Sequence, residues 1–239
     1  MQMRIVTCVA VLSASLLTGY RCANRLSAQE VPVKRNPVAQ LVSRNKAPEL
    51  PDVRAKPEFD AQFDPSEQKR VWKAVGELFK SADKNWDSIT ANINNDAYCV
   101  TVRTFNGSKY NWTVGDVCRK VTSVNLTAAY FQSLEPQTRE LYVNFREPDF
   151  ARNAKALKEW LEARPGKSLA ELQADACDWA LNRLAQRQER DDWSDKDRDR
   201  WTAAIRKTAE TLRADGVAIQ SKGFGHEEFQ LYFDDSGTK

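Results

Sequence analysis

The chain has 239 residues, with 36 basic and 33 acidic side chains and a formal net charge of +3. This length suits one sizeable domain or two small ones. The basic excess comes from the first 28 residues, which hold three arginines and no acidic residue, so the remainder carries 33 charges of each sign. A neutral remainder gives no compositional support for binding nucleic acid or an anionic membrane, because such binding depends on uncompensated Lys and Arg.

Residues 1–28 have the pattern of a cleavable signal peptide. Arg4 gives a positively charged start, residues 5–18 form an apolar run, and Ala28 supplies a small residue before the cut. The run is shorter than the roughly 20 residues that cross a bilayer. We therefore predict a secreted or periplasmic protein with no membrane span after cleavage. The alternative is a protein anchored to the membrane through an uncleaved signal.

Residues 29–64 contain five prolines, no glycine and only scattered aliphatic side chains. Proline removes a backbone donor and pushes the preceding residue toward extended conformations, so neither a helix nor a central strand propagates here. We predict an extended or disordered Pro-rich spacer. It would precede a single domain over 65–235 and a short tail over 236–239.

The domain is expected to open with a helix from Pro65 to about Ser81. Asp64 is suited to cap it, and Glu67 at the third position would complete a reciprocal capping box. The apolar side chains recur with the period of one helical face. They are Val71, Trp72, Val75, Leu78 and Phe79.

Residues 98–114 predict a β-hairpin, because two runs rich in β-branched and aromatic residues flank Asn106-Gly107. A two-residue turn would place Arg103 opposite Tyr110. Tyr110 and Trp112 are two positions apart and so share one face of the hairpin. These two aromatics are our candidate binding residues, although the same spacing also suits a face that packs on the core.

Three cysteines follow the signal region, namely Cys99, Cys118 and Cys177. An odd number allows one disulfide and one spare thiol. Cys99 and Cys118 bracket the hairpin, and we predict a disulfide between them, as befits an exported protein. The alternative is three buried free thiols, since free cysteine is a commonly buried residue.

The second half of the chain predicts further helices. Asp116 is suited to cap one of them, residues 127–134 suit a further turn, and residues 139–146 are ambiguous between strand and helix. Three well-patterned helices then begin near residues 148, 168 and 194. Gly216 is expected to end the last of them.

Strand character returns at the carboxyl end. Residues 217–221 and 228–233 flank a glycine-bearing loop and predict a second hairpin, with Leu231 facing the core. Helices and strands do not alternate regularly. The predicted class is therefore α+β, with several amphipathic helices packed against two β-hairpins behind a signal peptide and a spacer.

His226 is the only histidine, so any imidazole chemistry must use it. Glu227 and Glu228 would be placed to orient its ring. A site with several histidines for zinc is excluded within one chain. The acidic run from Asp195 resembles a calcium loop, but it lacks the required Gly and the bidentate Glu, so we predict no metal site and no cofactor.

Taken together, these patterns favour an exported, non-catalytic binding domain of unknown ligand. Its partner would be a protein or polymer of the envelope or exterior. The more suitable surfaces are the hairpin 98–114 and the loop 222–228. The alternative is an extracytoplasmic hydrolase in which His226, with Glu227 and Glu228, performs the catalysis.

Overall fold

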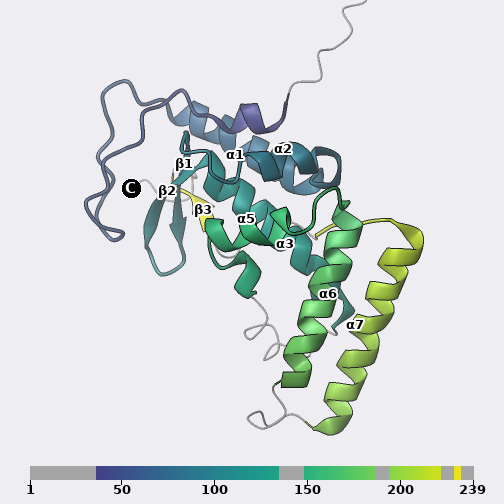
Figure 1. The fold of residues 1–239 in the computed structure, drawn as a ribbon. Coiled ribbons are helices and arrows are strands. Elements are labelled where there is room, and N and C mark those ends of the chain that lie inside the picture. Colours follow the sequence, from purple (N-terminus) through teal and green to yellow (C-terminus); the bar gives the residue numbers. More distant parts are fainter. Residues whose placement is uncertain (1–35, 135–147, 187–193, 222–228, 233–239) are drawn as a thin grey trace, which may run out of the picture. The chain divides into compact units, whose positions relative to one another are not determined.

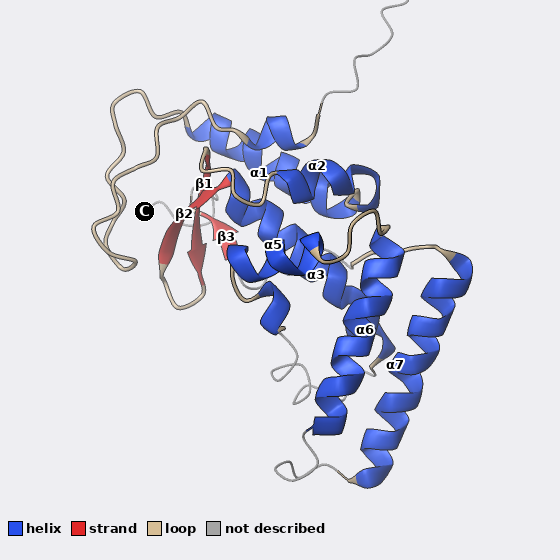
Figure 2. Cartoon of the chain, viewed as in Figure 1, coloured by secondary structure: helices blue, strands red, loops and turns tan. Residues whose placement is uncertain are grey.

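The computed structural model describes residues 36–134, 148–186, 194–221 and 229–232. These ranges form an α+β structure of α-helices, short 3-10 helices and one small antiparallel sheet (Figures 1 and 2). The α-helices are α1 (Pro65–Lys80), α2 (Trp86–Ala91), α3 (Val114–Ser133), α5 (Ala154–Glu162), α6 (Leu169–Gln186) and α7 (Asp195–Asp215). The 3-10 helices are η1 (Val38–Leu41), η2 (Asp83–Asn85) and η3 (Asp149–Ala151), and the strands are β1 (Tyr98–Thr104), β2 (Lys109–Thr113) and β3 (Phe229–Leu231). The predicted signal peptide, the tail and the ambiguous segment 139–146 lie outside the described residues.

Short polar side chains set the helix boundaries, as the sequence predicts. Asp64 accepts a hydrogen bond from the Ser66 amide at the start of α1. Ser168 and Glu171 form a capping box before α6. Gly216 ends α7 in the left-handed conformation, with φ of +64°, which only glycine adopts without steric cost.

Helix α3 is longer than expected and joins two predicted pieces into one. Thr113 caps it and Asp116 completes a capping box, so Asp116 lies at the third helical position and not at the cap. Gly115 donates to the Asn95 carbonyl at 2.8 Å. A Cβ at position 115 would lie 3.0 Å from backbone atoms of Asn95 and Ile93, so the close approach of this turn requires glycine.

The predicted first hairpin is present, but its register differs by one residue. Arg103 pairs with Lys109 and not with Tyr110. The reason is the turn, in which the Thr104 amide donates to the Ser108 carbonyl at 2.8 Å and so closes a three-residue loop. Gly107 takes a positive φ of +82° at the end of that loop, as is typical of three-residue hairpin loops.

The predicted second hairpin is wrong. Strand β3 pairs with β1, which places Leu231 opposite Val102, and the sheet has the order β2-β1-β3. Residues 217–221 are not in a strand. Leu231 is buried, as predicted. The carboxyl-terminal strand therefore adds a third strand to the first hairpin, and a partner distant in sequence replaces the local one.

The N-terminal segment, residues 36–64, differs from the predicted spacer. Val38 and Leu41 are buried in the hydrophobic core. Arg70 of α1 donates to the carbonyls of Gln40 and Val42, at 2.9 and 3.1 Å. The prolines do prevent long regular elements here, but an irregular chain can still bury isolated aliphatic side chains against a helix.

A single core cluster joins α1, α2, α3, α6 and α7 with the sheet. Helices α6 and α7 lie side by side (Figure 2), and Arg213 of α7 forms an ion pair with Asp178 of α6. No helix within the described ranges has both the length and the apolar character that crossing a bilayer requires.

Candidate functional site

The candidate site is the tip and outer edge of the β1–β2 hairpin. The N-terminal segment borders this edge, because the Lys109 amide donates to the Val53 carbonyl at 2.6 Å and the Lys109 ammonium donates to the Arg54 carbonyl at 2.8 Å. The side chain of Asn111 donates to the Pro48 carbonyl at 2.7 Å. These bonds occupy part of an edge that would otherwise present unpaired backbone groups.

The structure separates the two predicted binding residues. Trp112 is partly buried and contacts Trp72 of α1, with ring centroids 6.4 Å apart. Tyr110 remains exposed, with 38 % of its surface accessible. Trp112 therefore attaches the hairpin to the core, and Tyr110 is the more exposed residue of the pair.

Exposed apolar side chains gather at this hairpin. Phe105 in the turn is 70 % exposed, and Val53 beside β2 is 43 % exposed. Together with Tyr110 they make up what we call the tip surface, Val53, Phe105 and Tyr110. Among the residues that the structure describes, Val42 and Val217 are the other large apolar side chains with comparable exposure.

Two cationic residues lie next to the turn, on the face of the hairpin opposite to Tyr110. Arg103 and Lys109 are cross-strand partners, and Gln230 of β3 lies on the other side of Arg103. Neither Arg103 nor Lys109 forms an ion pair with a described residue. Like charges in this position oppose strand pairing, and the bond to the Arg54 carbonyl directs the Lys109 ammonium toward the outer edge of the sheet.

A hydrogen-bond network fixes the hairpin to α1. The buried Gln68 accepts from the Thr101 amide at 3.0 Å and from the Tyr98 hydroxyl at 3.1 Å, and it donates to Ser43 at 3.2 Å. Thr101 donates in turn to Asn111 at 2.9 Å. Burial raises the pKa of Tyr98 to about 12, so this hydroxyl stays protonated at neutral pH. The hairpin is therefore held in place before any partner binds.

The three described cysteines are free and buried. The predicted disulfide between Cys99 and Cys118 is absent from the structure. All three cysteines are instead buried free thiols, which was the alternative prediction. Burial raises the pKa of the Cys118 and Cys177 thiols to about 12, and that of Cys99 higher still. Because the thiolate is the nucleophile, these residues are unsuited to nucleophilic catalysis in the native state.

Thiol titration distinguishes the two arrangements. We expect Cys99, Cys118 and Cys177 to resist an aromatic disulfide reagent in the native protein at pH 8, and all three to react once urea unfolds it. Burial both lowers the thiolate fraction and blocks access. A bridge between Cys99 and Cys118 would leave Cys177 as the only one of the three to react in urea without reductant.

The other predicted site residues, His226, Glu227 and Glu228, lie outside the described residues, as does the whole of the loop 222–228. Within the described ranges, no group of three or more His, Cys, Asp and Glu side chains is placed to hold a metal ion. The acidic run from Asp195 forms the first turn of α7, where Ser194 caps the helix.

Sequence reasoning missed Val53, Phe105 and the pair Arg103–Lys109. Phe105 adjoins the Asn-Gly turn signal, so its exposure follows once a turn is assumed. The pairing of Arg103 with Lys109 depends on the strand register, and the register that we predicted from the sequence is shifted by one residue. Val53 lies in the predicted spacer, where no pattern indicated contact with the hairpin. Comparisons of this chain with protein-family models, curated proteins and solved structures found no match.

Proposed function

We propose that this chain is an exported, non-catalytic binding domain that engages a protein or polymer of the envelope or exterior through its β1–β2 hairpin. The observation that carries the proposal is the tip surface, and Arg103 and Lys109, which form no ion pair with a described residue, lie near it on the opposite face of the hairpin. Large exposed apolar groups next to polar ones are typical of interaction sites.

Burial of Phe105 contributes little to the free energy of folding, because 70 % of its surface stays in water. Aromatic side chains, phenylalanine among them, are enriched in the cores of protein interfaces. Gln68, Trp112 and the Asn111 side chain hold the hairpin beneath it. A preorganised surface loses little conformational entropy on binding, so the hairpin is suited to present Phe105 to a partner.

The charges at the site indicate the chemistry of the partner. Arg103 and Lys109 are cross-strand partners, neither forms an ion pair with a described residue, and the Lys109 ammonium donates only to the Arg54 carbonyl among the described residues. A partner that combines an apolar patch with a carboxylate or phosphate would bury the tip surface and neutralise this pair. Such complementarity contributes to association rate and specificity.

Replacing Phe105 with serine tests this proposal. We expect the variant to capture at least about tenfold less partner than the parent does from envelope and culture fractions of the native host. The reason is that truncation of a hot spot costs about 2 kcal/mol or more. Its free energy of unfolding should stay within about 0.5 kcal/mol of the parent, since the position is exposed. Quantitative capture on immobilised protein, followed by urea unfolding, measures both effects.

Val217→Ser is the matched control, because Val217 is 71 % exposed and follows α7, outside the β1–β2 hairpin. The control should retain the partner as the parent does. Equal losses in both variants would mean that general surface apolarity governs retention. Full retention by Phe105→Ser would show that the hairpin tip is not the binding surface.

A hydrolase dependent on His226 is the other candidate from the sequence. Its thiol form, with Cys118 or Cys177 as nucleophile, is disfavoured by the burial and raised pKa of both thiols. No contact within the described ranges favours the remaining forms, so the binding domain is the function that we propose.

A further inference from the structure

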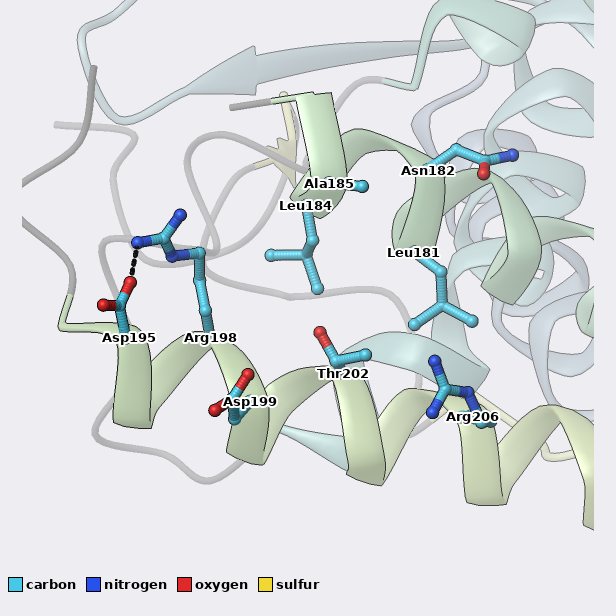
Figure 3. A pocket seen from close by; sticks show the side chains of 9 residues that line it. All are labelled: Leu181, Asn182, Leu184, Ala185, Asp195, Arg198, Asp199, Thr202 and Arg206. Atoms are coloured by element: carbon cyan, nitrogen blue, oxygen red, sulfur yellow. Dashed lines mark hydrogen bonds and ion pairs between the residues drawn. The ribbon is translucent and has the colours of Figure 1, made fainter. Parts of the chain in front are cut away.

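A cleft of about 700 Å³ lies between the carboxyl-terminal part of α6 and the amino-terminal half of α7. Figure 3 shows its two walls, which differ in chemistry. Leu181, Leu184 and Ala185 form the α6 wall, and the two leucines point toward α7. Thr202 lies between them on the α7 wall. The volume falls within the range that small-molecule sites typically occupy.

The charged groups of the α7 wall are not equivalent. Arg198 is paired with Asp195, so its charge is already partly neutralised. Arg206 is exposed and forms neither an ion pair nor a side-chain hydrogen bond within the described ranges. As far as the described residues go, the cleft therefore offers one guanidinium without an ion-pair partner, and Figure 3 shows it beside Leu181.

Thr202 and Arg206 are four residues apart on α7 and so share a face of the helix. Among the described residues the hydroxyl of Thr202 has no hydrogen-bond partner, so it is available to donate to an anionic group that enters the cleft. Asp199 lines the cleft about one turn before Thr202 on α7, and it forms no ion pair with a described residue. Its carboxylate would repel a second negative charge, so this wall favours a ligand with a single anionic end.

We propose that this cleft binds a small amphipathic monocarboxylate. Its carboxylate accepts hydrogen bonds from Arg206 and Thr202, and its hydrocarbon body packs along Leu181, Leu184 and Ala185. This site is separate from the hairpin and does not depend on the function proposed for it. Arginine is suited to the role, because its guanidinium matches the planar carboxylate.

The experiment is a calorimetric titration of the full chain with dodecanoate, below its micelle concentration and at low salt. We expect saturable binding by the parent. Arg206→Gln should weaken the affinity at least about tenfold, because a hydrogen-bonded charge pair partly removed from water is lost. Thr202→Val, which keeps the shape of the side chain, should weaken it a few fold. Dodecanol, which has the same chain without the charge, should bind at least about tenfold more weakly than dodecanoate.

Lys207→Gln is the matched control. It removes one positive charge from the next position of α7, which is exposed but does not line the cleft, and it should leave the affinity unchanged. Three results would overturn the proposal: absence of saturable binding, equal affinity for dodecanol, or unchanged affinity in Arg206→Gln. Unchanged affinity in Arg206→Gln would mean that dodecanoate binds outside the cleft, for example at the apolar residues 5–18. Circular dichroism of each variant establishes that the helices are retained.

Discussion

Replacing Gln173 with methionine should lower the free energy of unfolding by about 3 kcal/mol. Gln173 lies in α6 and is fully buried. Its amide nitrogen donates to the carbonyls of Asn125 and Ile219, both at 2.7 Å, and its carbonyl accepts from the Ile219 amide at 2.8 Å. The side chain thus bonds both backbone groups of Ile219, as a neighbouring strand would. Methionine has a similar length but supplies neither a donor nor a strong acceptor.

The size of this effect follows from the groups left behind. Each buried polar group without a partner costs about 1–3 kcal/mol. The substitution leaves the amide and the carbonyl of Ile219 without the partners that Gln173 supplies, while the Asn125 carbonyl keeps its bond within α3. Urea unfolding measures the total. Hydrogen exchange at the Ile219 amide reports the local effect, and we expect it to accelerate more than the exchange of core amides in α3.

Gln132→Met is the matched control, because Gln132 is an exposed glutamine with a single bond, to the Gln220 carbonyl at 2.8 Å. Water can replace that bond, so the loss should stay below about 1 kcal/mol. Equal losses in the two variants would contradict the role assigned to Gln173. Gln173 and Gln132 both hold the segment that leads from α7 toward β3, but only Gln173 does so out of contact with water.

Replacing Glu67 with glutamine should destabilise the protein by about 2 kcal/mol at pH 7. The carboxylate is only 6 % exposed. It accepts two hydrogen bonds from Arg70, both at 2.7 Å, and one from the Arg44 amide at 2.9 Å. The sequence predicted that Glu67 would close a capping box on Asp64. The structure uses it instead to hold the N-terminal segment on α1, because Arg44 and Arg70 offer charged and backbone donors together.

The effect depends on pH in a defined direction. Hydrogen bonds from Arg70, opposed by burial, lower the pKa of Glu67 from 4.5 to about 2. A carboxyl whose pKa is lower in the folded state stabilises the protein above its unfolded pKa and loses this contribution as the pH falls. Each pKa unit corresponds to about 1.4 kcal/mol, and the 39 % exposure of Arg70 reduces the total through solvent screening.

Urea unfolding from pH 7 to pH 2 tests this expectation. The parent should lose stability between about pH 5 and pH 2, and the difference between the parent and Glu67→Gln should shrink over the same interval. Glu77→Gln is the control, since Glu77 and Lys80 form an exposed pair at 3.4 Å. That substitution should cost less than about 0.5 kcal/mol. A pH-independent difference for Glu67→Gln would exclude the charge of Glu67 as its cause.

The sequence by itself determined those elements whose causes lie within a few residues. Asp64, Ser168 and Ser194 mark helix starts because each bonds an amide two or three residues ahead. Gly216 ends α7 because of its own left-handed conformation. The existence of the first hairpin likewise follows from Asn106-Gly107 and the alternating runs around it.

The tertiary structure alone decided every feature that depends on distant partners. It set the strand next to β1, since β3 arrives from more than a hundred residues away. It buried Val38 and Leu41 of a segment whose prolines indicated only the absence of regular structure. It separated Tyr110 from Trp112 in exposure, because Trp72 lies against one and not the other. Period and propensity report which residues share a face, whereas burial depends on which other element covers that face.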